Sequence, residues 1–229
     1  MTGSMGKTLA IARPGRVAYD AATRWQEALV ECRLAGDGPD AFLLLEHPAV
    51  YTLGRGADPR FLGRGADGEV PVVRASRGGQ VTWHGPGQLV GYPILDLRGH
   101  RQDVRWYVRE VEQALIDALA TLGIGAGRVD GLPGVWVDGR RKIGSVGIAI
   151  RRWVTWHGFA LNVAPDLGGF AAITPCGIDG VQMTSVAREG GTPEMEGVTD
   201  VVLAAFAARF GYNRLTPLAA DARGDEVRA

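Results

Sequence analysis

Cys176 is the residue of this chain whose sequence context best suits a nucleophile. It follows Pro175, whose ring restricts the approach of the chain, and it precedes Gly177, which permits an exposed turn. A thiol presented on such a turn can attack a carbonyl carbon, because the thiolate form is strongly nucleophilic. A free cysteine is more commonly a buried structural residue, so the residues alone leave both interpretations open.

Two other side chains could help such a thiol to react. Lys142 is conspicuous because the chain contains only one other lysine, Lys7. An ammonium group beside Cys176 would stabilise the thiolate by charge attraction and could exchange a proton with it, although a lysine at the start of a strand is usually solvated. His84 is the rival, since Cys/His pairs are the more familiar arrangement in thiol enzymes.

A glycine-rich run precedes these residues in the chain. Residues 77–88 read Arg-Gly-Gly-Gln-Val-Thr-Trp-His-Gly-Pro-Gly-Gln and contain four glycines. Glycine permits close approach of the backbone to a ligand, so the main-chain N–H groups of such a loop can line a substrate while a few side chains set its chemistry. Composition alone slightly favours a plain glycine-rich hairpin. The run indicates a particular function only when it is considered together with residues 142–147 and 174–178.

Together, these three segments resemble the octanoyltransferases of lipoate biosynthesis. The resemblance implies the catalytic fold that biotin and lipoate protein ligases share. It also implies that Cys176 carries the acyl group as a thioester, that Lys142 is its dyad partner, and that His84 lies in the substrate pocket. It extends from about Val17 to Gly211, shows no departure at a signature position, and is supported by four shorter segments: 46–48, 51–55, 134–136 and 157–162.

The same resemblance implies which residues contact the substrate. Gly147 and Gly158 lie in segments that the family uses around its substrate, so their backbone N–H groups are candidate donors to the oxyanion of acyl transfer, where one donor is worth about 3 kcal/mol. Tyr92, Val146 and Phe159 would line a slot for a medium-length acyl chain, or else belong to ordinary sheet core. The expected substrate-binding residues are Arg77, Gly78, Gly79, Gln80, Val81, Thr82, Trp83, His84, Ser145, Val146, Gly147, His157, Gly158 and Phe159.

The implied reaction is octanoyl transfer from octanoyl-acyl carrier protein to the target lysine of lipoyl domains, the first step of endogenous protein lipoylation. The acceptors would be the lipoyl domains of 2-oxoacid dehydrogenase complexes and the glycine cleavage H protein, and no cofactor, ATP or metal would be needed. The alternatives are an ATP-dependent lipoate or biotin protein ligase, and a non-catalytic module that binds acyl carrier protein or lipoyl domains. Cys176 and Lys142 together favour the transferase, because a ligase activates its acid as an adenylate and needs no cysteine nucleophile.

The composition is that of an ordinary globular protein. Of the 229 residues, 46% are hydrophobic and 22% are charged, and the net charge is zero, so we do not expect a nucleic-acid-binding protein. No apolar run is long enough to span a bilayer, and no secretory signal opens the chain. The two cysteines and four histidines are scattered without ligand spacing, so we expect neither a disulfide framework nor a metal site, and we expect a cytoplasmic location.

Hydrophobic periodicity predicts the helices that help to position these residues. Residues 19–35 carry an apolar stripe, which should bury Cys32 in the core: Ala22, Trp25, Leu29 and Cys32. Asp103 is expected to cap a second helix, which Gly123 ends. A last helix is expected to begin at Thr192-Pro193 and to end before Gly211.

Short apolar or alternating segments predict the strands. They lie at 41–45, 135–137, 143–150 and 154–162, and residues 81–97 suggest a hairpin-like pair around the turn 85–87. Strands and helices in this order favour an α/β (α+β type) fold, a mixed β-sheet with flanking helices. We expect a single catalytic domain over 7–215. The segment 216–229 is polar, alanine-rich and without periodicity, so we expect a disordered tail there.

Overall fold

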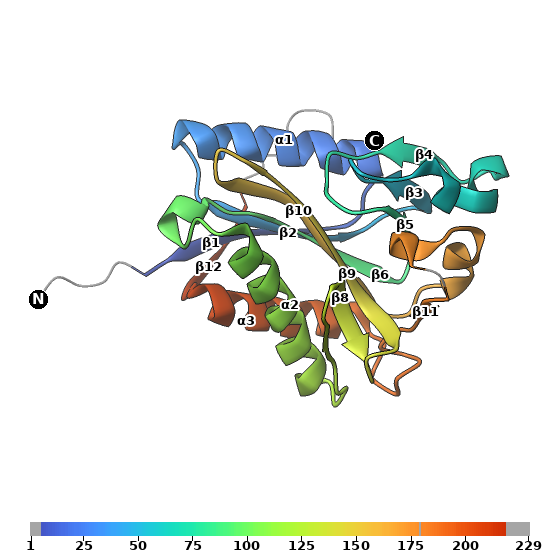
Figure 1. Ribbon diagram of the computed structural model, residues 1–229. Coiled ribbons are helices and arrows are strands. Elements are labelled where there is room, and N and C mark those ends of the chain that lie inside the picture. Colours follow the sequence, from blue (N-terminus) through green and yellow to red (C-terminus); the bar gives the residue numbers. More distant parts are fainter. Residues whose placement is uncertain (1–5, 179, 219–229) are drawn as a thin grey trace, which may run out of the picture.

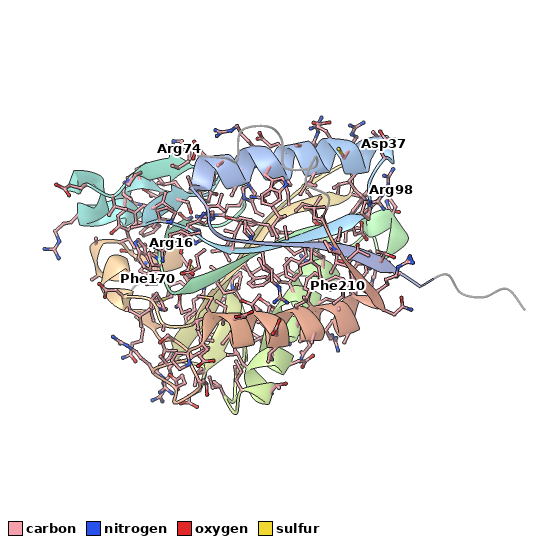
Figure 2. All side chains as sticks on the ribbon, turned by 180° about the vertical axis from the view of Figure 1, so that it is seen from behind. Arg16, Asp37, Arg74, Arg98, Phe170 and Phe210 are labelled. Carbon is pink, nitrogen blue, oxygen red and sulfur yellow. The ribbon has the colours of Figure 1, made fainter. Side chains whose placement is uncertain are left out.

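Helices pack on both faces of a large mixed β-sheet, which gives the molecule three layers (Figure 1). The computed structural model of the chain describes residues 6–178 and 180–218. Helix α1 (Tyr19–Ala35) covers one face of the sheet, and helices α2 (Val104–Thr121) and α3 (Met195–Phe210) cover the other. Figure 2 shows the same layers from behind, with α1 and α3 on opposite sides of the strands. Among the described residues, no helix is both long enough and apolar enough to span a membrane.

The strands form a large and a small sheet. In chain order they are β1 (Thr8–Arg16), β2 (Asp40–Glu46), β3 (Val50–Leu53), β4 (Val72–Arg74), β5 (Val81–His84), β6 (Gln88–Ile94), β7 (Gly127–Val129), β8 (Leu132–Val137), β9 (Arg141–Arg151), β10 (Val154–Asn162), β11 (Gln182–Met183) and β12 (Arg214–Pro217). The large sheet runs β12-β1-β2-β6-β10-β9-β8-β7, with β11 paired to β9. Strands β12, β1 and β2 are parallel, and the pairs from β2 through to β7 are antiparallel. This confirms the fold class expected from the sequence.

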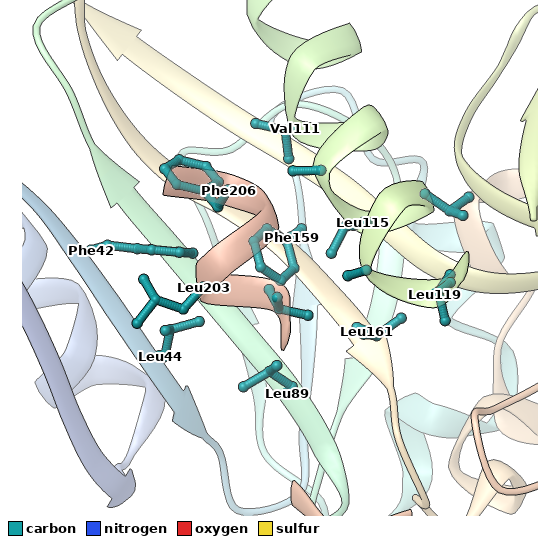
Figure 3. Close-up of a cluster of buried hydrophobic side chains, with 14 of the residues drawn as sticks. Phe42, Leu44, Leu89, Val111, Leu115, Leu119, Phe159, Leu161, Leu203 and Phe206 are labelled. Carbon is teal, nitrogen blue, oxygen red and sulfur yellow. The ribbon is translucent and has the colours of Figure 1, made fainter. Parts of the chain in front are cut away.

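The core between the sheet and helices α2 and α3 follows from the periodicity of its elements (Figure 3). Phe159 and Leu161 are two residues apart on β10, so they point to the same face of the sheet. On α2, Val111, Leu115 and Leu119 recur at every fourth residue, which places them on one face of the helix. All five side chains are 3% exposed or less. This packing fixes β10 and, through the ladder, the neighbouring strand β9, which carries Lys142.

Helix α1 has the expected bounds, but the prediction that Cys32 lies in the core was wrong. Cys32 is exposed, because it is turned roughly 90° from the centre of the buried face of the helix. Arg33 faces inward instead, and its Nε donates to Asp40 Oδ1 at 2.9 Å. The buried face consists of Tyr19, Ala22, Trp25, Gln26, Leu29 and Val30.

The caps of α2 are those expected, whereas α3 begins later than predicted. The Asp103 carboxylate accepts a bond from the Trp106 N–H at 3.0 Å, and Gly123, with φ of 78°, follows the end of α2. The Thr192-Pro193 start was wrong, since α3 begins at Met195 after Glu194. The exposed Thr-Pro sequence lies in the irregular segment that precedes the helix, and the first buried residue of α3 is Val198.

Strands β5 and β6 flank the turn 85–87 without pairing, so the expected hairpin was wrong. β5 pairs with β3 in the small sheet β4-β3-β5, and β6 lies between β2 and β10 in the large sheet. Gly87, in the connection between the two sheets, is bound to the large one: its N–H donates to Glu46 Oε2 at 2.7 Å, and its carbonyl accepts from the Val163 and Ala164 N–H groups at 3.1 and 2.9 Å. Its φ is +85°, and a Cβ would lie 2.5 Å from the Ala164 carbonyl oxygen, so glycine is required.

Thr216 and Pro217 belong to β12, so the disordered tail predicted from residue 216 was wrong for these two residues. Strand β12 pairs in parallel with residues 8–11 of β1, and the Leu218 N–H donates to the Ile11 carbonyl at 2.8 Å. The composition of this segment favours no structure, but the edge of β1 offers unpaired backbone groups that bind it. Residues 219–229 of the expected tail lie outside the described residues.

Candidate active site

Cys176 lies in the middle of the tight turn Pro175–Gly177, with a non-helical φ of 58° and ψ of 12°. This left-handed conformation costs of order 1–3 kcal/mol in residues other than glycine, and such strained residues cluster at functional sites. The turn is held by bonds from the Gly177 N–H to the Thr174 carbonyl (3.0 Å) and from the Ile178 N–H to the Pro175 carbonyl (3.1 Å). Cys176 is half-buried, as a presented thiol requires.

Lys142 donates a hydrogen bond to this thiol. Its Nζ lies 3.1 Å from Cys176 Sγ and 2.8 Å from the Pro133 carbonyl oxygen, and it is 5.1 Å from the ring centroid of Trp136. The side chain is only 2% exposed. A buried ammonium is costly unless an anion or several dipoles face it. The carbonyl and the aromatic face supply part of this stabilisation, and a thiolate at Cys176 would supply the rest.

Strand β11 anchors the segment that carries Cys176 against Lys142. It follows the Cys176 turn and pairs in parallel with the start of β9, where Met183 lies opposite Lys142. The Thr184 N–H then donates to the Lys142 carbonyl at 2.9 Å. The two members of the dyad, 34 residues apart, are therefore brought together by backbone pairing as well as by their side chains.

A cavity of about 340 Å³ opens beside the dyad, within the range of about 300–1,000 Å³ that is typical of small-molecule sites. It lies along β9 and β10, next to residues 77–82 and 131–133. Its lining is mostly apolar, as a slot for a hydrocarbon chain requires. Every expected substrate-binding residue except Trp83 lines it, as does Tyr92: Arg77, Gly78, Gly79, Gln80, Val81, Thr82, His84, Ser145, Val146, Gly147, His157, Gly158 and Phe159.

Trp83 does not line the cavity. On β5 its side chain points to the opposite side from Thr82 and His84, because strand residues alternate. Its ring packs against Phe170, with centroids 5.3 Å apart, in a separate hydrophobic cluster. We therefore assign Trp83 to the support of β5 and not to substrate contact.

Several cavity residues were not expected from the sequence. Tyr19 opens α1, Val108 lies on α2, Gly131 lies in the turn between β7 and β8, and Leu132 and Pro133 begin β8. Pro133 could have been found, since it directly precedes the segment 134–136 that supported the family resemblance. Tyr19 and Val108 carry no local signal and reach the cavity only through packing.

His84 does not compete with Lys142 for the thiol. Its Nδ1 donates to Gln88 Oε1 at 2.7 Å, and its Nε2 faces Thr52 Oγ1 at 3.4 Å. Burial lowers the pKa of His84 to about 3 and that of His157 to about 3. His47 packs beside them, with its Nε2 2.7 Å from the Tyr92 hydroxyl, and burial lowers its pKa to about 4. These histidines are therefore neutral near pH 7.

Acid should destabilise the protein through these three histidines. Their folded pKa values lie below the ordinary value of 6.5, so the unfolded chain binds protons more readily. Their stabilising effect is therefore present above about pH 6.5 and is lost as the pH falls toward the folded values. Between pH 7 and pH 5 we expect the free energy of unfolding to fall by roughly 2 kcal/mol per histidine. Urea unfolding at both pH values measures the difference, and equal free energies would contradict neutral burial.

Arg77 shapes the glycine-rich loop from inside. Its side chain is 7% exposed. One terminal nitrogen donates to the Gly78 and Gln80 carbonyls at 2.9 and 3.0 Å, and the other donates to the Thr52 carbonyl and hydroxyl at 2.7 Å each. Burial lowers the pKa of this guanidinium, which still carries a positive charge at neutral pH. Among the described residues its Nε has no hydrogen-bond partner.

The expected oxyanion donors Gly147 and Gly158 lie opposite each other in the β9–β10 ladder. Backbone N–H groups in a ladder point in the plane of the sheet, toward neighbouring strands. The two glycines line the cavity, but their N–H groups do not project from the face of the sheet. Neither position has room for a side chain: a Cβ on Gly158 would lie 2.2 Å from the Gly91 carbonyl oxygen on β6, and one on Gly147 would lie 3.2 Å from the Gly78 carbonyl oxygen.

No group of three or more histidine, cysteine, aspartate or glutamate side chains is arranged to hold a metal ion in the part of the chain that the structure describes. The lining of the cavity instead includes a thiol, an ammonium, a guanidinium and two neutral imidazoles, those of His84 and His157. A thiol paired with an ammonium suits nucleophilic acyl transfer.

Comparisons with known proteins agree with this geometry. Residues 18–207 match the family model of the lipoyl protein ligase A/B catalytic domain. The octanoyltransferase of Gloeobacter violaceus is 51% identical over 208 residues, covering 90% of this chain and 92% of that protein. The octanoyltransferase of Mycobacterium tuberculosis is 48% identical over 214 residues, covering 91% of each chain. The structure of lipoate-protein ligase A bound with ATP has the same fold, with a TM-score of 0.70 and 16% identity over 96% of this chain and 91% of that chain. The chain therefore belongs to the octanoyltransferases, acyltransferases that share the catalytic domain of lipoyl protein ligases A and B.

Proposed function

We propose that this acyltransferase carries the octanoyl group on Cys176 between two protein substrates. The observation that supports this most directly is the 3.1 Å contact between Lys142 Nζ and Cys176 Sγ beside a mostly apolar cavity. The dyad supplies an activated nucleophile, and the cavity can bury a hydrocarbon chain away from solvent. A module that only bound acyl carrier protein or lipoyl domains would need neither the buried ammonium nor the strained thiol turn.

The first step forms the acyl-enzyme. The Cys176 thiolate attacks the carbonyl carbon of the octanoyl thioester, a new carbon–sulfur bond forms, and the bond to the sulfur of the donor breaks. The departing thiolate takes a proton from the Lys142 ammonium. The octanoyl chain is left on Cys176, with its methylene groups against the apolar lining of the cavity.

The second step transfers the acyl group to an amine. The neutral ε-amine of the acceptor lysine attacks the Cys176 thioester, and the carbon–sulfur bond breaks to release the Cys176 thiolate. The attacking nitrogen loses a proton, which returns Lys142 to its ammonium form. The net change converts a thioester and an amine into an amide and a thiol, and it needs neither ATP nor a metal ion.

The substrates we propose are octanoyl-acyl carrier protein as donor and, as acceptors, the lipoyl domains of 2-oxoacid dehydrogenase complexes and the glycine cleavage H protein. Both partners must reach Cys176 in turn, because one thiol holds the acyl group between them. We further propose that the reaction takes place in the cytoplasm, where free thiols persist.

Intact mass measurement tests the acyl-enzyme. Incubation with octanoyl-acyl carrier protein, without an acceptor, should add one octanoyl mass that hydroxylamine removes. Because Cys32 is exposed and could react as well, the experiment is best done in a Cys32→Ala background. Cys176→Ala in that background should gain no mass, and an adduct that persists in this variant would overturn the assignment of Cys176.

Steady-state kinetics separates the transferase from the ligase alternative. A covalent intermediate predicts ping-pong behaviour, with parallel double-reciprocal lines at several fixed donor concentrations. The rate should not depend on ATP. Intersecting lines together with an ATP requirement would support an adenylate-forming ligase instead.

A further inference from the structure

We propose that Glu112 on α2 is a positioning residue that holds the Lys142 ammonium against Cys176 through the peptide unit between Pro133 and Gly134. The inference rests on the proposed role of Lys142 in activating the thiol. It assigns a function to a buried carboxylate that does not touch the substrate cavity.

Glu112 joins three elements through one carboxylate. It is 5% exposed, and its Oε1 accepts a bond from the Gly134 N–H on β8 at 2.9 Å. Its Oε2 accepts a bond from Arg128 Nε on β7, also at 2.9 Å. Arg128 is itself held by Gln113 Oε1 and by the Arg109 carbonyl, at 3.0 and 2.6 Å. The carboxylate is therefore fixed from both sides.

The Gly134 N–H and the Pro133 carbonyl belong to the same peptide unit. This unit is planar, and no cis peptide bond occurs among the described residues, so the N–H and the C=O point in opposite directions. Glu112 holds the N–H end, and the carbonyl oxygen at the other end accepts a bond from Lys142 Nζ at 2.8 Å. A carboxylate at the N–H also polarises the unit and strengthens the carbonyl as an acceptor.

The peptide unit between Pro133 and Gly134 packs closely against the Lys142 side chain, so a shift of this unit would displace the side chain. A Cβ on Gly134 would lie 2.7 Å from Lys142 Cε and 2.5 Å from the Gly144 carbonyl oxygen, and the φ of Gly134 is +117°. The backbone of β8 thus packs directly against the stem of Lys142. If the loss of Glu112 let β8 move, the Lys142 side chain would move with it. The distance of 3.1 Å between Lys142 Nζ and Cys176 Sγ would then change.

Two substitutions of Glu112 separate its hydrogen bond from its charge. Glu112→Gln keeps an oxygen that can accept from the Gly134 N–H but loses the negative charge beside Arg128. Glu112→Asp keeps the charge but withdraws the oxygen by one methylene group. If the bond to Gly134 matters for the dyad, the aspartate variant should be the slower of the two, although it is the one that preserves the ion pair.

The readout is alkylation of Cys176 by iodoacetamide across pH, in a Cys32→Ala background so that a single cysteine reacts. We expect Glu112→Asp to slow alkylation at pH 7 about fivefold or more and to move the rate–pH curve to higher pH, because the thiolate loses part of its ammonium. Glu112→Gln should stay within about twofold of the parent. Arg128→Met is the matched control, since it breaks the ion pair but leaves the bond to Gly134: it should lower the melting temperature and leave the rate–pH curve in place.

A double substitution tests whether Glu112 acts through Lys142. In a Lys142→Met background, Glu112→Asp should change the alkylation rate no further, because residues that act through one contact are not additive. The inference is overturned if Glu112→Asp lowers the melting temperature but keeps the parent rate–pH curve, or if its effect persists without Lys142. If Lys142→Met by itself leaves the curve unchanged, the proposed dyad fails, and that failure is independent of any result at Glu112.

Discussion

Cys176→Ser is expected to lower kcat/KM for octanoyl transfer by at least about a thousandfold, since loss of a nucleophile in enzymes of this type commonly costs 10³-fold or more. The structure of the site explains why oxygen cannot replace sulfur here. Lys142 is buried and donates hydrogen bonds to Sγ and to the Pro133 carbonyl. In the proposed resting state it is an ammonium, which can stabilise an anion but has no lone pair with which to deprotonate a hydroxyl. A thiol readily becomes that anion near neutral pH, whereas a hydroxyl does not.

Single-turnover transfer from a radiolabelled octanoyl donor measures this loss without interference from product release. Cys32→Ser is the matched control, because Cys32 is exposed on α1 and lies outside the cavity. It should keep the parent rate within about twofold, as surface substitutions usually do. Transfer by Cys176→Ser at more than a tenth of the parent rate would contradict the covalent mechanism.

The proximity of Cys176 and Lys142 could be predicted from the sequence because its signals are local, compositional and familial. The Pro175-Cys176-Gly177 context favours an exposed turn but leaves a structural cysteine possible, and Lys142 stands out in a chain with one other lysine. The family resemblance joined the two residues, and the structure places them 3.1 Å apart. Sequence reasoning could not find Glu112, since a glutamate in a helix is ordinarily a solvated residue and only the packing of α2 against β8 reveals its partner.

Other features of the site depend on geometry that short-range patterns do not determine. Trp83 lies between two residues that line the cavity, and the alternation of β5 turns it away from them. Tyr19 reaches the cavity from the start of α1, far from the motifs in sequence. Cys32 fits an apolar stripe at helical spacing, yet it falls at the edge of the buried face, where a small angular error decides between core and solvent.

The fold was predicted best where long segments of regular hydrophobic periodicity determine the bounds of a helix or strand. The bounds of α1 and most of strands β9 and β10 follow from such patterns, whereas only the second half of β8 was predicted. The pairing of β12 with β1 could not be found in this way, because its residues favour no structure on their own and bind to an edge that exists only in the folded chain. The same holds for β5 and β6, whose connection looks like a hairpin but joins two sheets.

Lys142→Met should have the second largest effect on activity. The thioether has a shape similar to the lysine stem but no charge, so the thiolate of Cys176 loses its ammonium partner at 3.1 Å. We expect alkylation of Cys176 near pH 7 to slow about tenfold or more, and kcat/KM for transfer to fall about a hundredfold or more, because proton transfer by a positioned group typically contributes 10²–10⁴-fold. Both rates can be measured on one preparation in the Cys32→Ala background.

Lys142→Arg separates the two proposed roles of the lysine, because a guanidinium restores the positive charge but does not give up a proton at these pH values. It should recover part of the alkylation rate and little of the turnover. The recovery should be incomplete even for alkylation, since the pocket is tight: Gly134 lies so close to the lysine stem that a Cβ there would be 2.7 Å from Lys142 Cε. If wild type and Lys142→Met are alkylated equally fast across pH, charge stabilisation of the thiolate is refuted. If Lys142→Arg regains full turnover, the charge alone suffices and Lys142 does not act as the proton carrier.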